Sequence, residues 1–337
     1  MKAWYFCLLV IGFALVAAVA HSQSGVEWET ISFTLDNDAF SLSNNDRYYT
    51  NGLHVRLESK PFNEFNRDTT PSLLLPLLPP FPLTTDTFDQ RTLAYQFGQA
   101  MFTPADITSS EPQPDDFPYA GLLYVAADLS ARNKHYVDTI RFMGGIVGPW
   151  SQADEAQQFI HRLINSNEPN GWEHQLHNEL VFNLMYERRM PFYMGQLERG
   201  FNYQWISIQQ VGLGTINTGA EVSLALLITK NSTDKSHKIQ SSITQSTYLF
   251  RSDLSQGFYA LLGVTGRITL RNIFLDGNTF RDSPSVEKEL LSAGIFYGVG
   301  YARRKWSISA NWVREGKRFE TQNEGLNYGS ITVTYRY

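Results

Sequence analysis

The stretch TISFTLD, Thr30 to Asp36, alternates strictly between polar and apolar residues. In an extended chain Ile31, Phe33 and Leu35 share one face, and the hydroxyl and carboxyl side chains share the other. This period predicts a β-strand that separates an apolar environment from a wet one. Such a pattern is typical of a membrane β-barrel, and a soluble β-sandwich shows the same period with weaker charge on its inner face.

The segment from Arg47 to Glu58 repeats the alternation. Leu53, Val55 and Leu57 form its apolar face, while the opposite face carries an imidazole, a guanidinium and a carboxylate. A charged inner face favours the barrel over the sandwich. We therefore expect the apolar side chains of both strands to face lipid.

Ten more segments have the composition and period of strands, which gives about twelve in all, an even number as bacterial barrels require. They are Thr92–Thr103, Tyr119–Ala131, Val137–Gly148, Gln175–Glu187, Gln204–Gly214, Ala220–Lys230, Gly257–Phe274, Glu289–Ala302, Lys305–Glu315 and Tyr328–Tyr337. The last one ends in ITVTYRY, which is similar to the signal read by the barrel assembly machinery. The sequence predicts an all-β fold, a transmembrane antiparallel β-barrel with a short helix at its extracellular rim.

Residues 1–20 have the features of a secretory signal peptide: a basic Lys2, an apolar run and a small-residue cleavage pattern at its end. An uncleaved anchor is the alternative, although the apolar run is short for a spanning helix. We expect the remainder, 21–337, to be one outer-membrane barrel domain. The single cysteine, Cys7, lies within the leader, as suits an envelope protein that folds without disulfides. Subtracting Lys2 leaves 28 − 1 = 27 basic residues against 33 acidic ones, with no basic stripe for nucleic acid.

Two segments break the strand pattern. Pro61 to Leu83 contains PSLLLPLLPPFPL, whose prolines exclude a regular helix or a central strand. We interpret it as a long apolar connection that touches the membrane surface or a partner. Ser151 to Asn167 has apolar residues at helical spacing, with Ser151 as a possible cap, and predicts a helix.

The predicted helix places Gln157 and His161 four residues apart, on one face. His161 is the best candidate for acid–base chemistry because an imidazole titrates near neutrality. His54, His174 and His177 are rivals. The alternative is a histidine on a capping helix with no chemical role.

Asp36, Asn37 and Asp38 end the first strand, and clustered carboxylate and amide oxygens suit a hard cation such as Ca²⁺. Strict alternation places both aspartates inward and Asn37 outward, although parity can fail at a strand end. The spacing does not match an EF-hand, and a solvated turn is the alternative reading. No G-x-S-x-G elbow, H-E-x-x-H or phosphate-loop pattern occurs, so covalent catalysis has no clear nucleophile.

Four stretches taken in order resemble the calcium-dependent outer-membrane lipid A 3'-O-deacylases: LDNDAF from Leu35, DRYYTNG from Asp46, DDFPYAGLLY from Asp115, and GIVGPWSQADEAQQFIHRLI through GWEHQL. The resemblance covers most of the mature chain. It implies a twelve-stranded barrel with a site in the lumen near the outer rim, between the wall and a short helix. It also implies lipid A or lipopolysaccharide as substrate, outer-membrane lipids as surroundings, and Ca²⁺ as cofactor.

Residue by residue, the resemblance assigns Asn37, Asp38, Thr50, Gln157 and His161 to the catalytic site. His161 would activate water, and Ca²⁺ held by Asp38 would polarise the ester carbonyl. This chain departs from the family pattern twice. The loop PADITSSEPQPDD has no basic residue where the family has a Lys-Arg pair, and Asn167 stands where the family has a glutamate, so we assign Glu168 as a further metal ligand.

The sequence thus favours an esterase that removes an acyl chain from lipid A. Two alternatives remain open at this stage: a barrel of the same fold acting on another lipid ester, such as a phospholipid, and a non-enzymatic pore or structural barrel. In a pore, Asn37, Asp38 and His161 would not converge.

Overall fold

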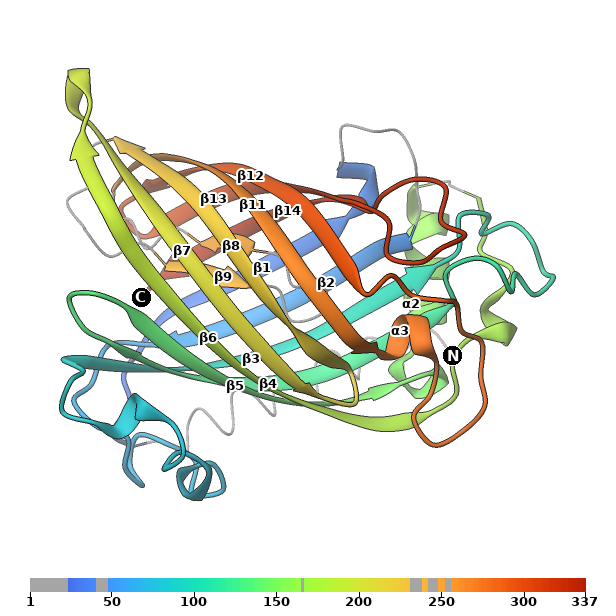
Figure 1. Ribbon diagram of the computed structural model, residues 1–337, viewed down its shortest axis with the longest axis horizontal. Coiled ribbons are helices and arrows are strands. Elements are labelled where there is room, and N and C mark those ends of the chain that lie inside the picture. The colour runs from blue at the N-terminus through green and yellow to red at the C-terminus, as the bar shows by residue number, and fades with distance from the viewer. Residues whose placement is uncertain (1–23, 41–47, 165–166, 231–237, 242–247, 252–255) are drawn as a thin grey trace.

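The computed structural model describes residues 24–40, 48–164, 167–230, 238–241, 248–251 and 256–337. Within this part of the chain, twelve antiparallel strands close into a barrel, in the order β1-β14-β13-β12-β11-β8-β7-β6-β5-β4-β3-β2 (Figure 1). The barrel predicted from the sequence is therefore confirmed. The predicted signal peptide and Cys7 lie outside the described residues.

The barrel strands are β1 (Trp28–Asn37), β2 (Tyr48–Ser59), β3 (Gln90–Thr103), β4 (Ala120–Arg132), β5 (Val137–Val147), β6 (Glu179–Gln196), β7 (Phe201–Gly214), β8 (Asn217–Lys230), β11 (Gln256–Asn272), β12 (Leu291–Arg303), β13 (Trp306–Glu315) and β14 (Asn327–Arg336). The helices are α2 (Ala153–Ile164) and α3 (Ile273–Asp276). Short 3-10 helices are η1 (Asp38–Phe40), η2 (Leu75–Leu77), η3 (Pro82–Thr84), η4 (Pro149–Ser151), η5 (Trp172–His174) and η6 (Glu198–Gly200). None of the helices in the described ranges is long and apolar enough to cross a membrane.

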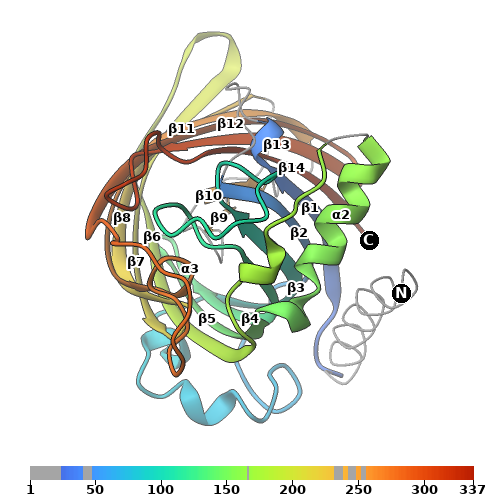
Figure 2. The same ribbon diagram turned by 90° about the vertical axis from the view of Figure 1, so that its right-hand side faces the viewer.

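Two strand regions differ from the sequence prediction. β6 starts four residues later than expected, because η5 and the residues after it still belong to a connection, and it then continues with β7 into a long hairpin. A two-stranded sheet of β9 (Lys238–Ser241) and β10 (Tyr248–Arg251) was not predicted. Figures 1 and 2 both place it within the outline of the barrel. Four residues are too few for periodicity to identify a strand.

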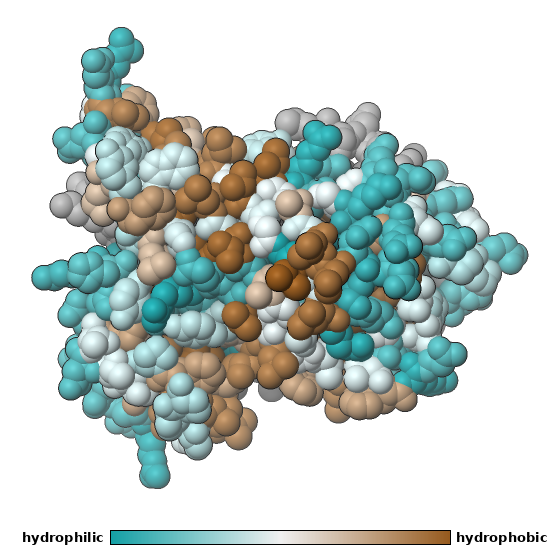
Figure 3. Space-filling model, viewed as in Figure 1, coloured by the Kyte–Doolittle hydropathy of each residue, from teal (hydrophilic) through white to brown (hydrophobic). Residues whose placement is uncertain are grey.

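The two faces of the wall follow the predicted alternation. Phe33 and Leu35 are 48% and 39% exposed on the outside, whereas Ser32 and Thr34 are buried and form 2.9 Å hydrogen bonds with hydroxyls of β14. Apolar side chains gather across the middle of the visible face in Figure 3, and hydrophilic ones dominate its right-hand end. An apolar belt on an outward face is what a bilayer requires.

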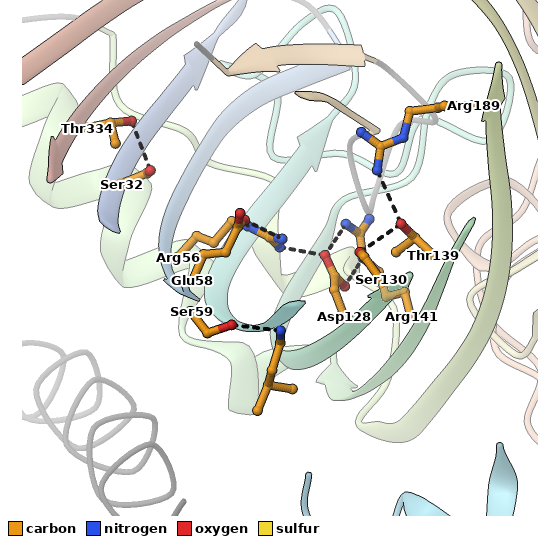
Figure 4. A network of polar contacts seen from close by, with 11 residues as sticks. Ser32, Arg56, Glu58, Ser59, Asp128, Ser130, Thr139, Arg141, Arg189 and Thr334 are labelled. Atoms are coloured by element: carbon orange, nitrogen blue, oxygen red, sulfur yellow. Dashed lines mark hydrogen bonds and ion pairs between the residues drawn. The ribbon is translucent and has the colours of Figure 1, made fainter. Parts of the chain in front are cut away.

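Charged side chains form a network on the lumen face of the wall (Figure 4). Asp128 accepts from Arg56 at 2.5 Å and from Arg141 at 2.6 and 2.7 Å, and Arg56 also bonds Glu58. All of these groups are buried, so each charge needs its partner. The network ties β2, β4 and β5 together from the inside.

We call the barrel end that carries η1, α2 and α3 the helical rim; the C-terminus lies at the other end (Figures 1 and 2). Aromatic side chains occupy the lumen at this rim. Phe102 stacks on Phe274 with ring centroids 4.0 Å apart and on Phe117 at 5.6 Å, and Tyr49 meets Tyr328 edge to face at 4.8 Å. They belong to one buried cluster, which leaves the lumen closely packed here.

The proline-rich segment lies at the opposite end, against the outer face of the wall. Leu78 and Leu83 are buried there among outward side chains of β3, β4 and β5, such as Leu93 and Leu129. These two leucines thus pack on the chain's own barrel, whereas Leu73 and Leu77 of the same segment are exposed. The sequence reading expected contacts with the membrane surface or a partner; the partner of these two leucines is the protein itself.

Candidate active site

The site begins with a row of residues that crosses the wall at the helical rim. Six residues on six neighbouring strands stand in register, each paired with the next. In order around the wall they are Trp312 (β13), Gly329 (β14), Asn37 (β1), Asn51 (β2), Met101 (β3) and Gly121 (β4). We call these six residues the rim row. They share parity with the outward residues Leu35, Val125 and Ile331, which are exposed. The rim row therefore lies on the outward face of the barrel.

One end of the rim row is covered by η1. The indole Nε1 of Trp312 donates to the carbonyl oxygen of Phe40 at 2.8 Å. A Cβ at Gly329 would lie 2.7 Å from Cβ of Phe40, so only glycine allows η1 to approach β14 this closely. η1 is thereby fixed beside β1 and β14, with Asp38, its first residue, fully buried.

The other end is covered by α2. Its residues Ala153 and Ala156 form a buried cluster with Met101 of the rim row, and with Tyr119 and Trp172. A side chain at Gly121 would collide with Ser151 and Ala153, so glycine is required here as well. Burial raises the pKa of Tyr119 to about 12, which keeps this phenol neutral in its apolar setting.

The start of α2 differs slightly from the prediction. The helix begins at Ala153 rather than Ser151, because Gln152 adopts a left-handed conformation with φ of 57°. The hydroxyl of Ser151 donates to the carbonyl of Gly148 at 2.6 Å instead of capping the helix. The backbone carbonyl of Ser151 accepts from Nε2 of Gln99 at 2.6 Å, which ties η4 to the outer face of β3.

Gln157 and His161 share the buried face of α2, as the spacing predicted; they are 1% and 5% exposed. Nδ1 of His161 lies 2.5 Å from the carbonyl oxygen of Asn167. A carbonyl can only accept, so Nδ1 carries the proton, and in the neutral ring Nε2 keeps its lone pair. Oε1 of Gln157 accepts from Nε1 of Trp172 at 2.7 Å. His161 is thus held in the tautomer that a general base needs.

Figure 2 shows α2 beginning beside β4 and β3 and running toward the β1 side at the edge of the barrel. From Ala153 to His161 the helix advances roughly 12 Å. From β4 to β1 the wall spans three strand spacings, roughly 14 Å. α2 thus lies along the outward surface that carries the rim row, with His161 on the buried face of the helix.

The expectation that His161 turns into the lumen was wrong. α2 packs on the outward face of the wall, and the lumen at this level is filled by the aromatic cluster around Phe102. A helix cannot enter a space that is already packed. Gln157 and His161 consequently lie on the outward, membrane side of the barrel, where α2 packs on the wall.

The remaining predicted residues fall into three situations. Asn37 is half-buried in the rim row and Asp38 is buried beside it. Thr50 lies in β2 at an irregularity in its pairing with β3, and its side chain is outside the described set. Glu168 is exposed. The rival His54 faces the lumen, where it contacts Asp36 at 2.8 Å and Tyr124 at 2.6 Å.

The donors at η1 are oxygens of the kind that Ca²⁺ binds. The described residues contain no group of three or more His, Cys, Asp or Glu side chains that could hold a metal. Asp38 offers a buried carboxylate next to the amide of Asn37, and both are hard oxygen donors of the kind Ca²⁺ prefers. Asp38 and Asn37 therefore offer the type of donor that Ca²⁺ binds, and a complete coordination shell would need further carbonyl or amide oxygens.

Three residues of this site were missed by the sequence reading: Asn51, Gln99 and Trp172. A signal was present for two of them. Asn51 shares the face of Leu53 and Val55, and Gln99 shares the face of Tyr95 and Phe97, so both are polar residues on an otherwise apolar face. Since a lipid-facing amide is costly, such positions predict a cover over the wall.

Comparison with known proteins places this arrangement in context. A family model described as outer membrane protein LpxR matches residues 7–337. LpxR from Salmonella typhimurium is similar in structure, with a TM-score of 0.73 and 14% identity over 91% of this chain and 100% of that chain. The β domain of the Bordetella autotransporter Brka is similar with a TM-score of 0.40 and 9% identity over 92% and 97%.

A search of curated proteins found no match. At 14% identity the Salmonella structure supports the fold alone, and the family model carries the assignment. Since that model extends over almost the whole sequence to its last residue, and the barrel closes as such a protein requires, the chain belongs to the LpxR family of outer-membrane proteins.

Proposed function

We propose that this protein is an esterase that removes an acyl or acyloxyacyl chain from lipid A in the outer leaflet of the outer membrane. The observation that carries the proposal is His161, buried between α2 and the outward wall with Nδ1 bonded to Asn167. A site on the membrane side of a barrel is accessible to a lipid ester by lateral diffusion. Family membership supports the same substrate class.

The helical rim would face the outside of the cell. Long connections occur at both ends, 148–178 and 273–290 here and 60–89 at the other, so the orientation follows from the proposed substrate, which the site must reach in the outer leaflet. The outward site would then lie at the level of the outer leaflet, where lipid A resides. The aromatic and charged packing of the lumen in the described residues argues against a pore.

In the proposed reaction Nε2 of His161 removes a proton from water, and the oxygen of that water attacks the ester carbonyl. The tetrahedral intermediate then collapses, the bond between the acyl carbon and the ester oxygen breaks, and the imidazolium returns the proton to the departing sugar or acyl hydroxyl, which releases a free fatty acid. Asn167 keeps the ring oriented through Nδ1, and Trp172 holds Gln157 beside it. Asn37 and Thr50 would orient the water or the carbonyl. Ca²⁺, when held by Asp38 with carbonyl oxygens and Glu168, would supply electrostatic stabilisation of the oxyanion.

Mass spectrometry of lipid A from cells with and without the protein tests the substrate. We expect the loss of one acyl or acyloxyacyl chain with the wild-type protein and an unchanged lipid A with His161→Ala. Analysis of phospholipids from the same cells addresses the alternative: loss of acyl chains from phospholipids with intact lipid A would contradict the proposal.

A Ca²⁺ titration after chelation tests the metal. Activity of the wild type should vanish in chelator and return with Ca²⁺, and Asp38→Ala should need much more Ca²⁺ for the same rate, because it loses the buried carboxylate ligand. Lys60→Ala, an exposed change at the other end of the barrel, is a control that should titrate as wild type. Full activity in chelator, or a covalent acyl-serine trapped during turnover, would contradict this mechanism.

A further inference from the structure

A hollow with a volume of about 1120 Å³ lies along β11 to β14 and the connection 316–325. Its lining includes the outward residues Tyr297, Trp312 and Arg314, and Lys317 of the connection. Tyr297 and Trp312 stack with centroids 5.6 Å apart and an interplanar angle of 18°, forming a flat shelf. The hollow is thus on the membrane side of the wall.

The hollow borders the candidate active site through one shared residue, Trp312. Trp312 is the first residue of the rim row, and its indole donates to Phe40 of η1, the element that begins with Asp38. A ligand resting on the shelf would therefore lie directly across η1 from Asn37. The site has α2 on one flank and this hollow on the other.

Among the described lining residues, the exposed charges are two basic groups and one acidic group. Arg314 and Lys317 are exposed, and in the described part of the chain no ion pair joins either of them to a carboxylate. Glu315 also lies along the hollow, but its carboxylate bonds Arg267 and Arg318 in the lumen. Glu324 is the one exposed acidic side chain among the described lining residues.

We propose that this hollow is a subsite for the phosphorylated sugar headgroup of the lipid substrate, with Arg314 and Lys317 as the phosphate contacts and the Tyr297–Trp312 shelf under the sugar. Arg and Lys near a membrane surface bind phosphate by charge-assisted hydrogen bonds, and aromatic faces support sugar rings and acyl chains. The inference rests on the proposed function for the identity of the lipid. It adds the part of the wall that would hold the headgroup while the ester reaches His161.

Equilibrium binding separates this subsite from turnover. The protein would be the His161→Ala form in detergent micelles, and the probes would be bisphosphorylated lipid A, fully dephosphorylated lipid A and phosphatidylglycerol. Exchanging both Arg314 and Lys317 for Gln should weaken binding of bisphosphorylated lipid A by about ten- to thirtyfold, since each exposed charged contact contributes modestly. Binding of dephosphorylated lipid A should change less than about twofold, and added salt should narrow the difference.

Two single changes complete the design: the first is a control outside the hollow, and the second tests the charge of the hollow. Arg303→Gln removes an exposed, outward arginine from β12 at the opposite end of the barrel and should leave binding unchanged. Glu324→Gln removes the acid from the hollow and should tighten binding of bisphosphorylated lipid A by about two- to threefold.

The subsite is overturned if the double variant binds bisphosphorylated lipid A like its parent, or loses affinity equally for the dephosphorylated form. Equal affinity for phosphatidylglycerol would also overturn it, because the shelf would then contribute nothing. A phosphate-dependent loss together with no ester hydrolysis by the wild type would retain the subsite and refute the proposed function instead.

Discussion

At the helical rim, the two faces of the same wall are built in opposite ways. The inward face carries a close-packed aromatic cluster around Phe102 and Tyr328, below which buried ion pairs fill the lumen. The outward face carries Asn37 and Asn51, covered by η1 and α2 and flanked by an open hollow. The inside has the packing of a core, and the outside has the space and the polar groups of a site.

This contrast explains how a barrel can act on a lipid. A ligand in the lumen would have to leave the bilayer and displace packed side chains, whereas one on the outward face needs only to diffuse sideways. Polar residues on that face are tolerated because α2 and η4 shield them from lipid: Gln99 bonds Ser151, and Gln157 bonds Trp172. The filled lumen supplies the rigidity on which the outward site depends.

The largest expected effect compares the histidines on the two faces. His161→Ala should lower the rate of ester hydrolysis by about 10²- to 10⁴-fold, the usual contribution of a general base. His54→Gln in the lumen should leave the rate per folded molecule within about twofold, because its contacts are Asp36 and Tyr124 inside the wall. Initial rates on purified lipid A, normalised to the heat-modifiable folded band, measure both variants.

The assignment of the active site to the outward face would be refuted if His54→Gln abolished ester hydrolysis and His161→Ala did not. A His54→Gln protein that is folded but inactive would return the chemistry to the lumen. His174→Gln is a matched control: it changes a half-buried histidine that bonds the carbonyl of Ser110 at the same rim, and it should retain activity.

The second prediction tests the lumen as the stabilising region. Asp128→Ala leaves Arg56 and Arg141 buried without their shared carboxylate and should lower the free energy of unfolding by about 3–5 kcal/mol. Thr334→Val, which removes one 2.9 Å hydroxyl bond to Ser32, should cost only about 1 kcal/mol. Urea titrations in detergent compare them, and KM should stay unchanged in both. A KM shift with Asp128→Ala would show that the lumen takes part in binding.

The barrel was predictable because its signal is local. Alternation in residues such as Phe33 and Leu35 depends on one strand at a time, and twelve such strands fix the class. The direction in which α2 packs was not predictable, since it depends on whether the lumen at that height is already occupied. Phe102, Phe117 and Phe274 come from separate parts of the chain, and only the closed barrel brings them together.

The candidate site was predictable in part for the same reason. The spacing of Gln157 and His161 is a property of one helix, so their shared burial followed from the sequence. The partnership of Gln157 with Trp172, and of Asn37 with Asn51, depends on a connection and on strand register. Neither can be deduced from residue types alone, although an amide such as Asn51 on an apolar face was a usable signal.

The smallest expected effect concerns the shield on the outward face. Trp172→Phe keeps the aromatic packing against Tyr119 but removes the indole N–H that Gln157 accepts. Leaving that buried oxygen unsatisfied should cost about 1–3 kcal/mol in stability, and loosening Gln157 beside His161 should lower kcat by about three- to tenfold with little change in KM. The double variant Trp172→Phe with Gln157→Met, which removes both partners of the hydrogen bond, should recover stability without recovering kcat. If the double variant regained full kcat, Gln157 would be a packing residue, and the site would reduce to His161 and the rim row.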